Sequence, residues 1–168
     1  MKKIIISTLM LISATSFAQV AIGKATVTTT SGSLECGDRN RGIILPYVDS
    51  QSAVPATEGS IIYDAQTKKV KYFNGTWQDL TVVNSGTVDL APQQNLTERT
   101  DAKTSIGTPT NTVGILVLED TNKAMILPKV ASPHLAIQNP APGMMVYDTT
   151  KKLLCVYNGT EWSFWKPE

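Results

Sequence analysis

The chain carries nearly the same phrase twice, which limits its possible folds more than any single motif does. "GSIIYDAQTKKVKYFNGTW" runs from Gly59 to Trp77, and "GMMVYDTTKKLLCVYNGTEW" runs from Gly143 to Trp162. Glycine, Tyr-Asp, Asn-Gly and Trp follow in the same order, and Tyr63 aligns with Tyr147 at an offset of 84 residues. A duplicated segment of this kind predicts two similar substructures within one chain.

The repeat extends upstream of this phrase. "RGIILPYV" (Arg41–Val48) matches "KAMILPKV" (Lys123–Val130) at an offset of 82 residues, and "AIGKATVTTT" (Ala21–Thr30) resembles "SIGTPTNT" (Ser105–Thr112). The small change in offset falls in a Pro/Ser/Ala-rich stretch, where loops tolerate length changes. One unit therefore spans about sixty residues, within the range of known structural repeats.

Each unit predicts β-structure. "GSIIYD" and "KVKYFN" are β-branched and aromatic runs separated by a polar turn. Asn74-Gly75 and Asn158-Gly159 are strong hairpin signals because both residue types accept positive φ. "GIILP" and "AMILP" predict a short buried strand that ends at proline, and apolar residues nowhere keep a helical period for three turns. The predicted fold class is mainly β, with two similar small antiparallel β-meander units joined by a polar linker.

The predicted linker is "TVVNSGTVDLAPQQNLTERTDAKT", rich in Thr, Asn, Gln and Asp. This composition favours an irregular segment, with one short strand at "TVDL". The predicted organisation is a signal peptide, a first β unit, the linker and a second β unit at residues 1–18, 19–80, 81–104 and 105–168.

The first residues have the layout of a bacterial secretory signal peptide. Lys2 and Lys3 precede an apolar run that is too short to span a bilayer, and Ser16-Phe17-Ala18 places small residues before the cleavage point. The sequence predicts export, with the periplasm, the outer-membrane surface and the extracellular space as alternative locations. Cleavage after Ala18 changes the formal net charge from +1 to about −1, which gives no electrostatic basis for binding nucleic acid.

The titratable residues indicate no cofactor and no metal. His134 is the single histidine, and Cys36 and Cys155 occupy non-equivalent places in the two units. In an exported chain these cysteines could form a disulfide or remain two small buried side chains, and the sequence leaves both alternatives open. Asp64 and Asp148 follow strand tyrosines, where Asp commonly binds the backbone of its own turn, so we favour that role over catalysis.

The assembled motifs resemble a module common in exported proteins of Bacteroidetes, particularly flavobacteria. They read "LEDTNKAMILPKV", "GMMVYD" and "YNGTEW" in the second unit and "RGIILP", "GSIIYD" and "FNGTW" in the first. The first unit departs from this pattern at "ECGDRN", which puts its early strand in doubt. Related modules occur in large surface proteins and beside tail-fibre-like domains, so the resemblance implies a structural or adhesive role and a homotrimer.

The C-terminal "WSFW" has no counterpart in the first unit. It predicts a contact surface formed by Trp162, Phe164 and Trp165, because exposed apolar clusters usually mark interfaces. The other aromatics recur at equivalent places in both units, which favours a role in the core over a sugar-stacking platform.

The leading hypothesis is a non-enzymatic, exported structural or protein-interaction module of the cell envelope, adhesin-like or fibre-like. The partners it predicts are another protein or further copies of the chain. A carbohydrate-binding module that uses exposed aromatics to hold a polysaccharide is the alternative.

Overall fold

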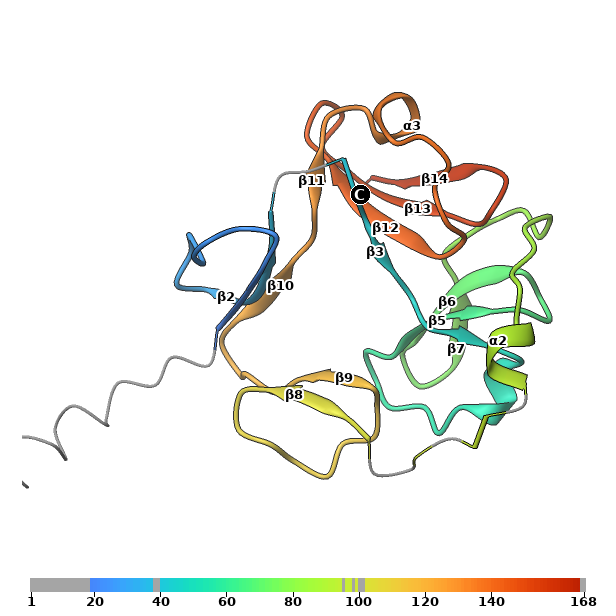
Figure 1. Ribbon diagram of the computed structural model, residues 1–168, viewed down its shortest axis with the longest axis horizontal. Helices are drawn as coiled ribbons and strands as arrows, with labels where there is room; N and C mark the ends of the chain where they lie inside the picture. Colours follow the sequence, from blue (N-terminus) through green and yellow to red (C-terminus); the bar gives the residue numbers. More distant parts are fainter. Residues whose placement is uncertain (1–18, 38–39, 95, 98, 100–101, 167–168) are drawn as a thin grey trace, which may run out of the picture.

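The computed structural model describes residues 19–37, 40–94, 96–97, 99 and 102–166, and the predicted signal peptide lies outside them. The described chain is mainly β, as the sequence predicts, and its helical segments are single short turns (Figure 1). None of the described helices has the length and apolar character needed to cross a membrane.

The two units contain the same series of elements. Unit 1 consists of β1 (Val20–Ile22), β2 (Gly32–Cys36), β3 (Ile43–Ile44), β4 (Tyr47–Val48), the 3-10 turn η1 (Gln51–Ala53), β5 (Ile61–Asp64), β6 (Lys69–Phe73) and β7 (Trp77–Asp79). Unit 2 consists of β8 (Thr104–Ile106), β9 (Leu116–Leu118), β10 (Ala124–Ile126), β11 (Lys129–Val130), α3 (Pro133–Ala136), β12 (Met144–Asp148), β13 (Leu153–Tyr157) and β14 (Trp162–Trp165). Between the units lies α2 (Ala91–Gln94).

Strand registers repeat with the sequence offsets. Tyr47 is paired with Tyr63 in the parallel pair β4–β5, and its counterpart Lys129 is paired with Tyr147 in β11–β12. Leu34 of β2 has Val20 as its partner, and Leu116 of β9 has Thr104. The offsets of 82 and 84 residues therefore identify structurally equivalent positions.

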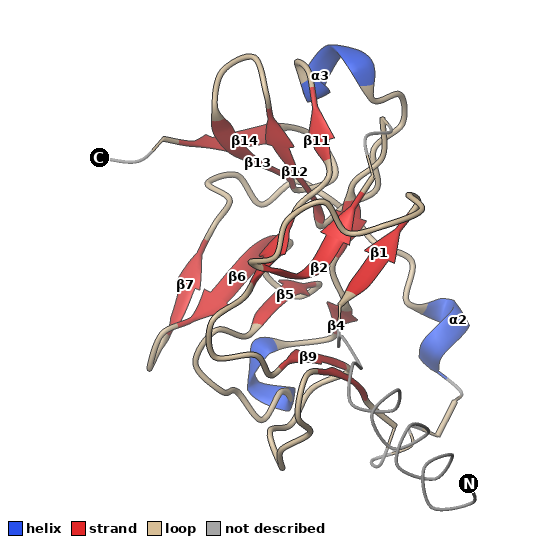
Figure 2. Ribbon diagram, turned by 90° about the vertical axis from the view of Figure 1, so that its left-hand side faces the viewer, coloured by secondary structure: helices blue, strands red, loops and turns tan. Residues whose placement is uncertain are grey.

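Each unit contains the predicted antiparallel meander, β5–β6–β7 in unit 1 and β12–β13–β14 in unit 2. In Figure 2 the unit 2 meander lies above the unit 1 meander. The parallel pairs β1–β2 and β8–β9 were not part of the sequence prediction. In each pair a loop returns the chain so that the second strand lies beside the first and runs in the same direction.

Two strands cross from one unit to the other. β3 of unit 1 joins the unit 2 sheet, where Ile43 and Ile44 pair with Met145 and Met144 of β12. β10 of unit 2 joins β2 of unit 1 as a parallel strand. The units are thus interlocked by backbone pairing in both directions.

The largest apolar cluster lies between the two meanders. It combines Tyr63, Val70 and Leu80 of unit 1 with Met145 and Val156 of unit 2. A second cluster covers the opposite face of the unit 2 sheet, beneath α3, and is built from Val130, Ile137, Met144, Val146 and Cys155. Alternate residues of β13 thus enter different clusters, which explains why this strand lacks a polar face.

Three local expectations need correction. "TVDL" is not a strand; residues 87–90 are irregular and lead into the short helix α2. β2 forms and is fully buried despite the unusual "ECGDRN" that begins within it, because it lies between β1 and β10. Ile44 in "GIILP" is 52% exposed, not buried.

Candidate self-association surface

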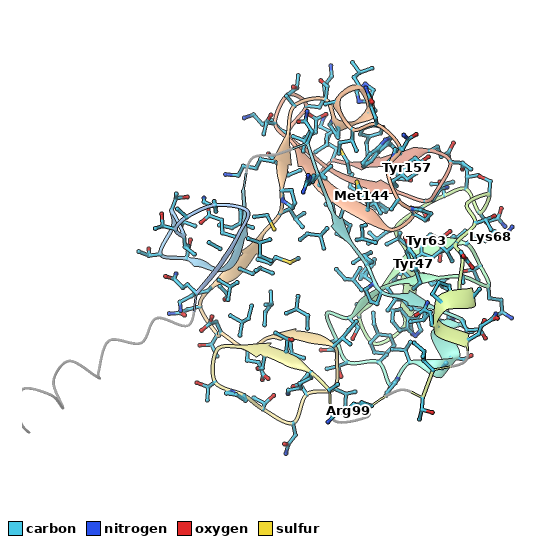
Figure 3. All side chains as sticks on the ribbon, viewed as in Figure 1. Tyr47, Tyr63, Lys68, Arg99, Met144 and Tyr157 are labelled. Carbon is cyan, nitrogen blue, oxygen red and sulfur yellow. The ribbon has the colours of Figure 1, made fainter. Side chains whose placement is uncertain are left out.

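The contact between the units is anchored by hydrogen bonds from two tyrosines of unit 1. The hydroxyl of Tyr63, which is 0% exposed, donates to the carbonyl oxygen of Asn158 at 3.0 Å. The hydroxyl of Tyr47 donates to the carbonyl oxygen of Pro142, also at 3.0 Å. Their rings meet edge to face with centroids 5.6 Å apart, and Figure 3 shows them side by side where the meanders meet.

Asn158 fixes the turn at the end of β13. Its side-chain oxygen accepts the backbone N–H groups of Thr160 and Glu161 at 2.8 and 2.9 Å, and its side-chain nitrogen donates to the carbonyl of Val83 at 2.8 Å. The predicted turn pair Asn158-Gly159 therefore connects β13 to β14, and Asn158 also binds the linker through Val83 and unit 1 through Tyr63.

The equivalent turn of unit 1 has the same connection but a different environment. Asn74 and Gly75 connect β6 to β7 and are exposed, whereas Asn158 is buried. Gly75 has φ +94° and Gly159 has φ +108°, so both glycines occupy the region that disfavours other residues. The end of unit 1 thus presents to solvent a surface whose counterpart in unit 2 is covered.

Open strand edges mark further differences between the units. β2 lies between β1 and β10, whereas β9 pairs with β8 alone among the described strands. The edge of β12 that faces away from β13 is fully occupied, by β11 and β3. The equivalent edge of β5, which faces away from β6, is only half occupied, by β4. No described strand pairs with Ser60 or Ile61 on that edge. Apolar residues at or beside these strands are strongly exposed: Ile44, Val113, Ile115 and Leu116.

A groove on unit 2 has a volume of about 520 Å³. We call it the unit 2 groove, and it is lined by Leu127, Tyr147, Lys152, Leu154, Trp165 and Lys166. Leu127, Tyr147 and Leu154 are equivalent to Leu45, Tyr63 and Val70, which pack in the cluster between the meanders. Leu127 and Leu154 pack against the border of that same cluster, so the groove is the half-buried unit 2 version of a surface that unit 1 buries more fully.

The predicted contact residues of β14 are divided between its two faces. Trp162 packs on Tyr157 with ring centroids 5.2 Å apart, and Phe164, 43% exposed, meets the His134 ring edge to face at 5.8 Å. Trp165 is 42% exposed, and its indole N–H donates to the carbonyl of Leu80 at 2.7 Å. One of the three thus links the units directly, and whether the set binds a partner stays a prediction.

The two strand-end aspartates bind their own turns. Asp148 accepts backbone N–H groups of Thr150, Lys151 and Ser132, and Asp64 accepts those of Thr67 and Gln51. Burial opposes ionisation of Asp148, but these N–H donors outweigh it and lower the pKa of the carboxyl. Both side chains are engaged in local structure, as the turn interpretation expects.

Cys36 and Cys155 are free buried thiols, which settles the choice the sequence left open. Burial raises the pKa of Cys155 to about 11, so this thiol is un-ionised at neutral pH. In the described part of the chain, His, Cys, Asp and Glu side chains form no group suited to holding a metal ion.

Two further carboxylates fasten the loops between parallel strands. Glu35 binds Lys24 and both the backbone N–H and the hydroxyl of Thr28. Glu119 binds the backbone N–H of Thr110 at 3.0 Å and the hydroxyl of Ser105 at 2.8 Å, with Lys103 at 3.2 Å. Hydrogen bonds, led by those from Lys24 and Thr110 respectively, lower the pKa of each glutamate to about 2.

Residues 105–167 match the model of a phage tail-like trimerisation region. The matched segment is unit 2, which contains the unit 2 groove, the open edge of β9 and the β14 aromatics. The match supports self-association and a structural, fibre-like character. No match was found among curated protein sequences or among solved structures.

Sequence reasoning identified the turns and the aromatic C-terminal strand but missed the exchange of β3 and β10. The available clue was that "GIILP" and "AMILP" are too short to form sheets of their own, so each required a partner strand elsewhere.

Proposed function

We propose that the protein is a non-enzymatic structural module that assembles into a homotrimer within a fibre-like or adhesin-like structure of the bacterial envelope. The match of residues 105–167 to a phage tail-like trimerisation region carries this proposal. Open strand edges with exposed apolar residues support it, because such edges favour pairing with another chain.

The mass of the purified protein in solution tests the assembly. Sedimentation equilibrium across a hundredfold range of concentration is expected to give three times the mass of the chain. A species that remains monomeric at the highest concentration would contradict the proposal.

Export is the second part of the proposal and rests on the signal-peptide layout of residues 1–18. The protein is expected in the periplasm, at the outer membrane or outside the cell. Fractionation of the native host, followed by N-terminal sequencing, should find a chain that begins at Gln19. An uncleaved chain in the cytoplasm would exclude this location.

A further inference from the structure

We infer that neighbouring copies of the chain associate by repeating the contact that joins its own two units, so that unit 2 of one copy binds unit 1 of the next. The inference rests on the proposed self-association and identifies the surfaces that form it. A head-to-tail contact of this type either closes into a ring or continues as a fibre. Here it closes with three chains.

The strand edges left open are those that this arrangement fills. Within the chain, β3 of unit 1 pairs with β12 of unit 2 at Met144 and Met145. The equivalent contact places β10 of one copy against Ser60 and Ile61 of β5 in the next copy. Reciprocally, β3 of the next copy adds to the open edge of β9, as β10 adds to β2 within one chain.

Side-chain sizes at the inferred contact are complementary. Within the chain, Ile43 lies opposite Met145; between chains, the equivalent pair is Met125 opposite Ile61, with the same two residue types exchanged. A Cβ added to Gly42 would lie 2.3 Å from Met144, so a glycine faces a large side chain there. The equivalent pair between chains is Ala124 with Ser60. Ala124 is larger than Gly42 and Ser60 is smaller than Met144, so the combined volume of the pair is partly maintained.

Polar contacts also carry over. The hydrogen bond from Tyr63 to the Asn158 carbonyl becomes one from Tyr147 to the carbonyl of Asn74, whose turn is exposed in the single chain.

A second hydrogen bond within the chain joins Tyr47 to Pro142. The residues equivalent to these two are Lys129 and Glu58, respectively. Both are exposed and carry opposite charges. In the inferred contact Lys129 takes the place of Tyr47 and Glu58 takes the place of Pro142, so an ion pair can replace the hydrogen bond. Two surfaces that never touch would not be expected to change together in this complementary way, so the joint change supports contact between Lys129 and Glu58.

The unit 2 groove supplies the apolar part of the contact. Its residues Tyr147 and Leu154 correspond to Tyr63 and Val70, which pack against Met145 and Val156 within the chain. The residues of the next copy that correspond to Met145 and Val156 are Ile61 and Tyr72, both half-buried at the border of the same cluster.

Cysteine cross-linking tests the pairing directly. In the double variant Ile61→Cys/Met125→Cys, oxidised glutathione is expected to join neighbouring copies, because directly opposite residues of paired strands have Cβ atoms at about the distance a disulfide needs. Non-reducing electrophoresis should show linked dimers and trimers, with the trimer as the final product. The matched control is Ile61→Cys/Leu135→Cys, since Leu135 is 77% exposed on α3, away from the inferred contact. The two single variants report any contribution from Cys36 and Cys155.

Charge exchange provides an independent measurement on residues that are exposed in the single chain. Glu58→Lys and Lys129→Glu are each expected to raise the dissociation constant about tenfold, and the double exchange should restore it. Circular dichroism melts verify that each variant is folded.

The outcomes distinguish the two proposals. A monomeric wild type overturns both the trimer and the contact. If the wild type is trimeric but the Ile61→Cys/Met125→Cys variant forms no cross-links, or forms no more than the Ile61→Cys/Leu135→Cys control, the contact alone is overturned. Linked products longer than three chains overturn the closed ring.

Discussion

At the scale of single residues, the two Asn-Gly turns show how neighbours determine the cost of a substitution. Gly75 and Gly159 share a positive φ, but a Cβ at Gly75 has nothing within 4 Å, whereas at Gly159 it would lie 2.9 Å from the Cα of Gly86 and 3.1 Å from Pro142. The same residue type at equivalent positions therefore faces open solvent in one unit and packed backbone in the other.

We expect Gly159→Val to lower the free energy of unfolding by more than about 1 kcal/mol, because a β-branched residue is strained at positive φ and also clashes. Gly75→Val incurs the strain alone and should cost less. Urea denaturation of both variants measures the difference, and equal losses would show that the turn at Gly159 is not confined by Gly86 and Pro142.

The two loop glutamates make stability depend on acid. Glu35 and Glu119 have pKa values of about 2, below the ordinary value of 4.5. A carboxyl with a lowered folded-state pKa stabilises the fold fully above its unfolded pKa, and this contribution is lost as pH falls through the folded value.

We therefore expect the melting temperature to fall between pH 4.5 and pH 2, as protonation releases Thr28 and Thr110 from their carboxylate partners. Glu35→Gln and Glu119→Gln should melt lower than wild type at pH 7 and should show a shallower acid dependence. Scanning calorimetry at closely spaced pH values checks both effects, and a double variant that matches the wild-type slope would assign the acid sensitivity to other groups.

At the scale of elements, the linker has two parts with different constraints. Thr81 and Gly86 are buried, and the hydroxyl of Thr81 accepts the backbone N–H of Val70 at 3.1 Å. Further along, Leu96 is 74% exposed. The first part is attached to the packed structure at Thr81 and Gly86, although the Val82 side chain between them is 81% exposed, and at Leu96 the second part has no such anchor among the described residues.

We expect thermolysin to cut beside Leu96 in preference to any site in residues 81–86. The nicked halves should elute together under native conditions, because β3 and β10 remain paired across the units, and should separate in denaturant. Mass spectrometry locates the cut, and Leu96→Gly is the matched control that should slow it. Halves that separate under native conditions would show that the exchanged strands do not hold the units together.

The meanders were predictable because their information is local: β-branched runs, a polar turn and Asn-Gly lie within about twenty residues of one another. The exchange of β3 and β10 was not predictable, since the choice between pairing within a unit and pairing across units depends on distant strands. Asn74 and Asn158 have the same sequence context, but only Asn158 is covered by other parts of the chain, where Tyr63 and Val83 bind it. The three aromatics of β14 were identified as unusual, but nothing in the sequence indicated that Trp165 would bind Leu80.

At the scale of the whole molecule, self-association links stability to concentration. A folded chain that is further stabilised by assembly unfolds at a higher temperature as its concentration rises.

We expect the melting temperature of the wild type to increase with each tenfold rise in concentration. Leu116→Asp places a charge on the open edge of β9 and should give a melting temperature independent of concentration. Leu135→Asp is the control and should behave as the wild type. Differential scanning calorimetry measures all three, and a wild-type melt that does not change with concentration would argue against assembly.

The strand exchange between units also bears on how the assembly begins. A ring of six equivalent units built from single-unit chains requires six molecules to meet, and each loses translational and rotational freedom on joining. Fusing two units in one chain makes every second contact intramolecular, at an effective concentration set by the linker. Three contacts between molecules then complete a ring that would otherwise need six, so a two-unit chain is expected to assemble at lower concentrations than its separated halves.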